Sequence, residues 1–435
     1  MRPEVYRILW LKVVILTLIS IVAVPNASHG LVGDTDGSFG LDGSIRTYAN
    51  YIDYTRLPSF FTGDDDSDYS LQAILRVTAG GRPTELLTYE IHLVQSLIYT
   101  SADDTDTIFL FPMRARYQAL DATWDQLEEG YTSARLKLDR FNIKFSFEKA
   151  DLTLGRQAIT FGKAYFWNPL DIFLPFEPQQ LDRDYKSGVD AFRLDIPFGN
   201  FSGLNLIGVW GPKIFPESNE NKTWDSSSYG SALLARVYTT MMDWDFALQG
   251  GKIYGGYQIG GGAVGEIGKL EARLEAEYLG ATESDPMPFP LQGDIFEDHL
   301  TLVAGIGRMF ENSFVFELEY LYNGAGDPHN LEASLLRFGL GSSLHMGEHL
   351  MGFMLKYDIL PIFTSQLAWI YSISDQSSLV QPAFFLSVSD EVDLFFGATI
   401  SQGERPSDAN GLIPRLESEF GIYPDLYFIS LKFYF

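Results

Sequence analysis

The stretch that decides the fold is the C-terminal Leu426-Tyr427-Phe428-Ile429-Ser430-Leu431-Lys432-Phe433-Tyr434-Phe435. Side chains alternate between the two faces of a strand, so one face carries Tyr427, Ile429, Leu431, Phe433 and Phe435. An unpaired apolar strand at the edge of a soluble sheet invites aggregation. A strand that closes a barrel pairs along both edges and turns its apolar face to lipid. The stretch therefore predicts an all-β, transmembrane antiparallel barrel, with a soluble edge strand as the alternative.

This ending resembles the C-terminal strand of bacterial outer-membrane β-barrels, which ends on Phe after alternating apolar residues. The resemblance implies that the five apolar residues named above form the signal that the barrel-assembly machinery reads. It also implies a bacterial outer-membrane location, with outer-membrane lipids and lipopolysaccharide around the protein.

Residues 1–30 have the three parts of a secretory signal peptide. Arg2, Arg7 and Lys12 form a basic segment, residues 13–24 an apolar core, and residues 25–30 a small-residue exit. The alternative is an uncleaved membrane anchor, but a helix needs about 20 apolar residues to span a bilayer. We therefore expect a cleaved signal peptide at 1–30 and a barrel domain at 31–435.

Charge and composition narrow the function. A net charge of −26 argues against binding nucleic acid, because polyphosphate is repelled. Acidic clusters near residues 64–68, 103–106 and 128–129 are either solvated loops or sites where divalent cations bridge to lipopolysaccharide phosphates. The chain has no cysteine, its histidines lack metal-ligand spacing, and no nucleophile motif is present. We expect no enzyme activity, no metal site and no cofactor.

Alternating segments recur with short and long connections in turn. The short ones are 80–83, 148–151, 197–200, 240–243, 266–268, 311–313, 359–361 and 389–391, and the long ones are roughly 57–68, 101–131, 162–188, 211–228, 281–297, 324–345 and 403–424. Tight periplasmic turns and long extracellular loops are typical of outer-membrane barrels, and the pattern predicts about 18 strands, within a range of roughly 16 to 20. Residues 114–124 and 331–344 are ambiguous. Few residues precede the first strand, so we expect no plug domain.

Charged residues that alternate with apolar ones must face the lumen, because a basic residue in lipid costs about 2 to 4 kcal/mol. The predicted lumen-facing residues are Arg76, Glu271, Arg273, Glu275, Glu277, Glu317, Glu319, Lys356 and Asp358. Acids and bases are roughly balanced among them. The pattern indicates a mixed-charge inner wall, with the surplus negative charge in the loops.

Three neighbouring segments, 152–162, 166–173 and 186–193, form the most distinctive internal stretch. They contain Gly-Arg-Gln at 155–157, Phe-Gly at 161–162, Asn-Pro-Leu-Asp at 168–171 and Gly-Val-Asp-Ala-Phe-Arg at 188–193. This pattern resembles Gram-negative outer-membrane barrels of the porin and polysaccharide-export kind. Phe161 departs from it, since that position is more often Trp. The resemblance implies a barrel but does not specify a substrate.

The loop 162–188 between these strands is long, aromatic and rich in proline, which favours a constriction folded into the lumen. In a regular strand Arg156 would lie on the same face as Leu154, and an arginine cannot point at lipid with it. We therefore expect a bulge near Gly155. The candidate constriction residues are Arg156, Gln157, Asp171, Glu177, Asp182, Arg183, Asp184, Lys186 and Arg193. In the alternative interpretation, Arg156 and Arg193 pair with loop carboxylates and hold the loop in place.

Together these features predict an outer-membrane channel for passive or substrate-selective passage of small polar or charged solutes. The alternative, from a different class, is a structural barrel around partner proteins, such as the sleeve of a porin and cytochrome electron conduit. Periplasmic or extracellular cytochromes would then be the partners.

Overall fold

The computed structural model describes residues 32–33, 37–58, 66–101, 116–176, 180, 184–213, 223–287, 291–407 and 414–435. The predicted signal peptide at 1–30 lies outside these residues. So do three of the candidate constriction residues, Glu177, Asp182 and Arg183.

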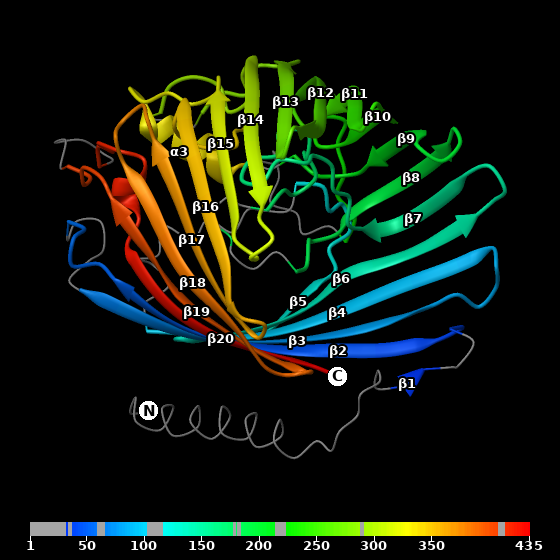
Figure 1. Ribbon diagram of the computed structural model, residues 1–435, viewed down its shortest axis with the longest axis horizontal. Coiled ribbons are helices and arrows are strands. Elements are labelled where there is room, and N and C mark those ends of the chain that lie inside the picture. The colour runs from blue at the N-terminus through cyan, green and yellow to red at the C-terminus, as the bar shows by residue number, and fades with distance from the viewer. Residues whose placement is uncertain are drawn as a thin grey trace.

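Nearly all the described secondary structure is antiparallel strand (Figure 1). The strands are β1 (Val32–Gly33), β2 (Gly40–Asp53), β3 (Ser67–Gly81), β4 (Leu87–Thr100), β5 (Thr123–Glu129), β6 (Thr132–Ser146), β7 (Asp151–Gln157), β8 (Val189–Pro197), β9 (Ser202–Val209), β10 (Ala232–Met241), β11 (Trp244–Ile253), β12 (Gly256–Ile267), β13 (Leu270–Ala281), β14 (His299–Met309), β15 (Val315–Asn323), β16 (His349–Leu360), β17 (Phe363–Ser372), β18 (Ser378–Ser389), β19 (Val392–Gln402) and β20 (Asp425–Tyr434). The helix α3 spans Leu331–Gly339, and a short 3-10 helix, η1, spans Phe420–Ile422.

The sheet closes on itself. Its 20 strands include β1, which pairs with β2 through only two residues, and β5, which lies beside β7 on one edge of β6. The other 18 form a ring that closes where β20 pairs with β2 from Ser44 to Asp53. The predicted antiparallel barrel of 18 strands is confirmed.

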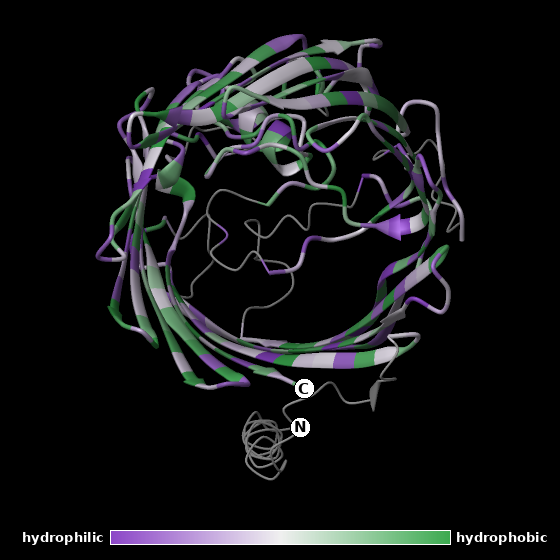
Figure 2. Ribbon diagram, turned by 45° about the vertical axis from the view of Figure 1, so that its right-hand side comes forward, coloured by the Kyte–Doolittle hydropathy of each residue, from purple (hydrophilic) through white to green (hydrophobic). Residues whose placement is uncertain are grey.

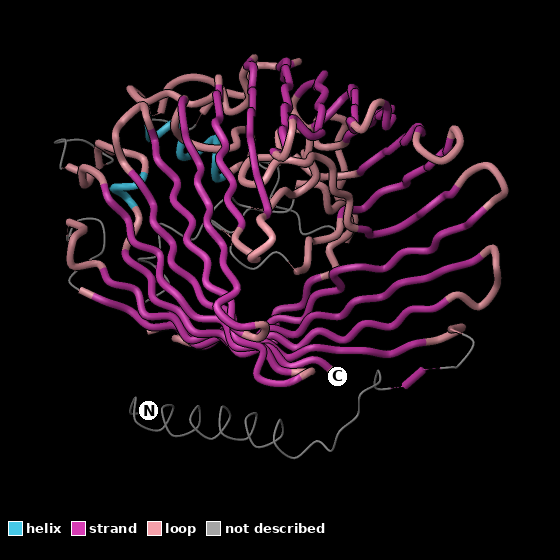
Figure 3. The backbone as a smooth tube through the Cα atoms, viewed as in Figure 1, coloured by secondary structure: helices cyan, strands magenta, loops and turns pink. Residues whose placement is uncertain are grey.

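Hairpin turns and long loops lie at opposite ends of the barrel (Figure 3). Each of the predicted short turns joins two paired strands, and each predicted long connection separates two others. Of the ambiguous segment 114–124, the described residues 116–122 lie outside the named strands and only the last two residues begin β5, a partial strand; of the segment 331–344, residues 331–339 form α3. No helix in the described ranges is long and apolar enough to cross a bilayer.

Side chains alternate between the two faces of the wall as predicted. On β13, Leu274 is 49% exposed on the outer face, whereas Glu275 is 1% exposed on the inner face. On β20, Ile429 is 49% exposed and Ser430 is 1% exposed. The backbone of Phe435 exchanges hydrogen bonds of 2.8 and 3.0 Å with Gly43, so the terminal residue itself takes part in closure.

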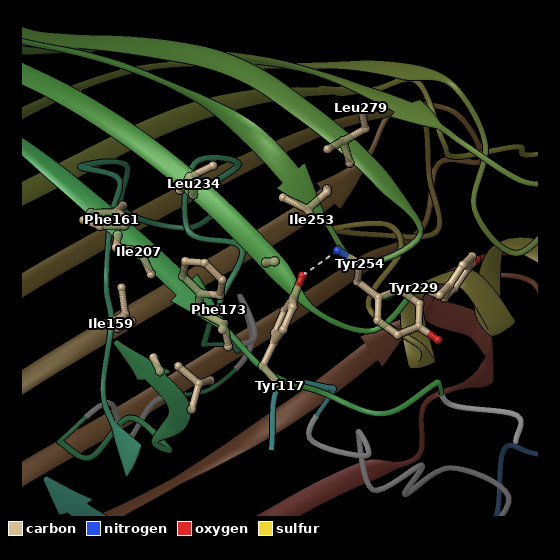
Figure 4. Close-up of a cluster of buried hydrophobic side chains, with 14 of the residues drawn as sticks. Tyr117, Ile159, Phe161, Phe173, Ile207, Tyr229, Leu234, Ile253, Tyr254 and Leu279 are labelled. Atoms are coloured by element: carbon tan, nitrogen blue, oxygen red, sulfur yellow. Dashed lines mark hydrogen bonds between the residues drawn. The ribbon is translucent and has the colours of Figure 1, made fainter. Parts of the chain in front are cut away.

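Described segments of the chain lie inside the ring (Figure 2). The two halves of the inner wall differ: one carries the apolar clusters that pack on these segments, and the other, which we call the polar half, carries a row of basic residues. From β8 to β18 the inner wall carries apolar clusters that pack against residues of the loop between β7 and β8, alongside buried polar residues such as Glu275 and Glu319. Figure 4 shows one such cluster, in which Ile159, Phe161 and Phe173 of that loop approach Ile207 and Leu234 of the wall. Across the ring, the inner faces of β20, β2, β3, β4 and β6 carry Lys432, Arg46, Arg76, His92 and Arg140.

Candidate functional site

The candidate site is the loop between β7 and β8, residues 158–188, which we call the lumen loop. The strand before it contains Gly155, whose φ is +112°. Glycine adopts this backbone conformation readily, whereas other residues would be strained in it. A side chain there would also clash with the carbonyl oxygen of Phe141. The pairing of β7 with β6 and β8 runs without a register shift, so the predicted bulge is wrong. A positive φ at Gly155, within regular pairing, takes its place.

Arg156 is buried in the wall. Its guanidinium donates to both carboxylate oxygens of Asp190 on β8, at 2.7 and 2.9 Å, and to the carbonyl oxygens of Leu138 and Leu120. Residues 116–122 pack against the ends of β7 and β8, since Asp190 N–H donates to the Tyr117 carbonyl. The pair closes the wall where the lumen loop departs, and the carboxylate involved lies on a strand rather than in the loop.

Gln157 and Arg193 also have local partners. The buried Gln157 amide donates to the carbonyl oxygen of Ala191 at 3.3 Å. Arg193, partly exposed on the inner face, pairs with Asp195 on its own strand at 2.8 Å. In the described part of the chain, neither Arg156 nor Arg193 forms an ion pair with a lumen-loop carboxylate, because their carboxylate partners lie on β8.

Wall carboxylates hold the first half of the lumen loop by its backbone. Glu319, which is 0% exposed, accepts hydrogen bonds from the N–H groups of Tyr165, Phe166 at 2.9 Å and Trp167 at 3.3 Å. Glu275 accepts the N–H of Lys163. Backbone N–H groups in a packed interior need acceptors, and two carboxylates on the wall supply them here.

Wall amides complete this arrangement by donating to loop carbonyl groups. Gln249 on β11 donates to the carbonyl oxygen of Leu170 at 2.9 Å, and Gln258 on β12 donates to that of Pro169 at 3.2 Å. Gln258 also donates to Glu277 on β13. The loop is therefore held by both kinds of backbone group, which fixes its depth in the barrel.

Within the lumen loop, Asp171 and Lys186 form a buried ion pair at 2.6 Å. Burial raises the pKa of Asp171 despite the adjacent ammonium, and burial lowers the pKa of Lys186. Gly162 has a φ of +90° and packs against Asn168, so a tight turn begins the inward path. The pair ties the outgoing and returning parts of the loop together.

The returning part of the loop reaches the polar half of the ring. The carboxylate of Asp184 accepts hydrogen bonds from Arg46 on β2 at 2.7 Å and from Lys432 on β20 at 2.9 Å. The ring of Tyr185 lies 4.9 Å from the guanidinium carbon of Arg46 and 4.2 Å from that of Arg76. A loop that touches β13 and β15 at one point and β2 and β20 at another crosses the interior.

The remaining candidates lie on the inner wall, some in a network of ion pairs around Arg273 and the others apart from it. Arg273 pairs with Glu271 at 2.7 Å and with Glu317 at 2.7 Å, and it lies 3.7 Å from Glu319. Arg76 pairs with Asp139 at 2.8 Å. Lys356 is exposed, and Asp358 accepts a hydrogen bond from Thr364 at 2.7 Å. The described residues contain no group of three or more potential metal-binding side chains.

Several residues that matter to this site were not among the candidates. Tyr185 lies in the lumen loop and contacts the wall, and the wall residues Arg46, Lys432, Asp190 and Gln258 contact the lumen loop or its point of departure. Alternation along the last strand puts Lys432 on the inner face, and this was the one sequence signal that could have identified it as a site residue. Nothing in the sequence indicated which loop residue would meet it.

No protein-family model and no curated protein sequence matches this chain. Solved structures do match it. OccAB4 of Acinetobacter baumannii has a TM-score of 0.53 and 8% identity over 92% of this chain and 99% of that one. OccK11 (OpdR) of Pseudomonas aeruginosa has a TM-score of 0.53 and 12% identity over 93% and 98% of the two chains, and OpdQ of the same organism has a TM-score of 0.51 and 9% identity over 91% and 98%. At these identities the likeness establishes a shared fold, the closed 18-stranded antiparallel barrel.

Proposed function

We propose that this protein is a porin-like channel of the bacterial outer membrane, through which small polar or charged solutes pass. The observation that carries the proposal is the lumen loop, which is anchored at Glu275 and Glu319 on one side of the ring and at Arg46 and Lys432 on the other. The apolar outer face of the barrel suits contact with lipid. The lumen loop, anchored inside the ring, narrows the lumen without the need for a separate domain.

The polar half of the ring provides the route for solutes. Its charged residues are arranged in pairs: Arg76 with Asp139, Arg140 with Glu90, and Lys144 with Asp151. In the opposite half the lumen loop packs on the wall through apolar clusters, which narrows the lumen there but leaves a pocket toward the hairpin-turn end. We therefore place the route along β20, β2, β3, β4 and β6, past Asp184 and Tyr185.

The sleeve alternative has less support. A barrel that encloses a partner protein needs an open interior, whereas here the chain's own loop crosses it and packs on the wall from β8 to β18. The same proposal includes the outer-membrane location, the assembly signal at 427–435, contact with lipopolysaccharide and the signal peptide at 1–30.

Recording from purified protein in planar bilayers tests the channel function. Discrete ion-current steps from protein without haem partners are expected. A folded, inserted barrel that carries no current would refute the proposal.

A further inference from the structure

A pocket of about 330 Å³ opens into the lumen beside the lumen loop, toward the hairpin-turn end of β10 and β11. Gly162, Lys163 and Leu170 of the loop form one side of it. Arg236, Tyr238 and Asp245 of the wall form another.

One end of the pocket carries an arginine without a carboxylate. Among the described residues no acid lies within ion-pair distance of Arg236, and its buried Nε atom has no hydrogen-bond partner. Its guanidinium carbon lies 4.8 Å from the ring centre of Phe161 and 5.3 Å from that of Tyr238, and Nη1 donates to Asn205 at 3.3 Å. On the same inner wall, Arg46, Arg76, Arg140, Arg193 and Arg273 all have carboxylate partners.

The other end is acidic. Asp245 lies 3.8 Å from the ammonium of Lys163, and both side chains are more than half exposed. An exposed ion pair of this kind is weak and is easily exchanged for another. Glu275, buried on β13 at the level of Tyr238 and Gly262, lies midway between the two ends; it uses one carboxylate oxygen for the N–H of Lys163, and its Oε2 has no partner in the described part of the chain.

The two ends are separated along the wall. Asp245 pairs with Thr240, four residues along β10 from Arg236. At the strand rise of about 3.3 Å per residue, the two backbone positions are about 13 Å apart. The guanidinium carbon of Arg236 lies 5.3 Å from the ring centre of Tyr238, which is the next inward-facing residue of β10 toward Asp245. Between the two ends the pocket is lined by Tyr238, Leu170 and Gly262, which suit an apolar spacer, together with the buried carboxylate of Glu275.

We propose that this pocket binds an extended zwitterionic solute, with its carboxylate at Arg236 and its ammonium at Asp245 in place of Lys163. The inference names a solute class for the channel proposed above and rests on that proposal for its role, but the binding itself does not depend on conduction. A single charge would satisfy only one end of the pocket, and a solute with two charges close together would not span it.

Calorimetry on the detergent-purified protein tests the binding, with 6-aminohexanoate as the probe. Saturable binding is expected, and it should weaken by about tenfold, equivalent to about 1.4 kcal/mol, for N-acetyl-6-aminohexanoate and for 6-aminohexanamide, which each lack one charge. Arg236→Gln and Asp245→Asn should each weaken binding of the probe to a similar extent. Lys356→Gln, which changes an exposed inner-wall lysine outside the pocket, should leave it unchanged.

The outcomes separate the two proposals. Absence of saturable binding in folded, heat-modifiable parent protein would overturn the site, whatever the protein conducts. Equal affinity for the three compounds, or equal loss in the Lys356 variant, would also overturn it. Binding with the expected pattern in a protein that carries no ion current would support the site and refute the channel.

Discussion

Glu319 should determine whether the lumen loop stays in the barrel. Its buried carboxylate accepts three backbone N–H groups, from Tyr165, Phe166 and Trp167. A hydrogen bond to a charged group contributes about 1.5 to 3 kcal/mol. Glu319→Ala leaves all three donors without that acceptor, so we expect the inward conformation to lose at least about 3 kcal/mol after some relaxation. Glu319→Gln keeps one carbonyl acceptor and should cost less.

The chain contains no cysteine, so a single introduced thiol can report loop opening. Leu170 is a buried residue of the lumen loop. In a Leu170→Cys background, Glu319→Ala should raise the rate of labelling by a membrane-impermeant maleimide by about 100-fold, because each 1.4 kcal/mol is a factor of about ten in the open population. The single-channel current should become larger and noisier.

Glu271→Gln is the matched control. Glu271 lies on the same inner face, its side chain is about half exposed, and it pairs with Arg273 rather than with the loop. Labelling and current in this control should match the parent. If Glu319→Ala labels no faster than Glu271→Gln, the carboxylate does not hold the loop.

Three further predictions follow from the same assignments. Leu274→Arg places a charge on the lipid face and should destabilise the barrel by about 2 to 4 kcal/mol in urea unfolding, whereas Glu271→Arg faces the lumen and should fold; equal damage from both would mean that the faces of β13 are misassigned. Deletion of residues 433–435 removes the terminal apolar side chains and the pairing of Phe435 with Gly43, so exported protein should accumulate unassembled, and normal heat-modifiable barrel in the outer membrane would rule out their role. In the Leu170→Cys background, Lys186→Met leaves Asp171 buried without its cation, which raises its folded pKa further above the unfolded value, so stability present at low pH is lost as pH rises. Every thiol labels faster as its thiolate fraction rises with pH, so the measured quantity is the ratio of the labelling rate in this variant to that in the Leu170→Cys parent at the same pH. That ratio should be larger at about pH 8 than at about pH 5, and a ratio independent of pH would contradict the buried pair.

The barrel could be predicted from sequence because its signals are local and repeated. In β13 and β15, apolar and charged residues alternate over the full strand, and that alternation alone sets which face meets lipid. The positions of the turns could be predicted from where this alternation stops. The apolar pattern of the last strand indicated that the chain ends in a strand that closes the barrel.

The site was less accessible because it depends on contacts between distant segments. Alternation places Glu275 and Glu319 inside the barrel. The same alternation would be seen whether these carboxylates faced water or accepted hydrogen bonds from the N–H groups of a loop. Arg156 shows the same limit: its phase suggested a bulge, but residues 116–122 bury it instead. The partners Asp190 and Leu120 are 34 and 36 residues away in sequence, and no local pattern indicates them.

The central claim is that the lumen loop sets the size of the pore, and one measurement tests it most directly. Residues 163–185 are replaced by a short Gly/Ser linker, and single-channel conductance is compared with that of the parent. The variant should assemble, because β7 still pairs with β8 from Asp151 to Gln157, and heat-modifiable migration confirms this before recording. The account predicts a clearly larger conductance in the variant. An assembled variant with the conductance of the parent would show that the loop does not constrict the pore.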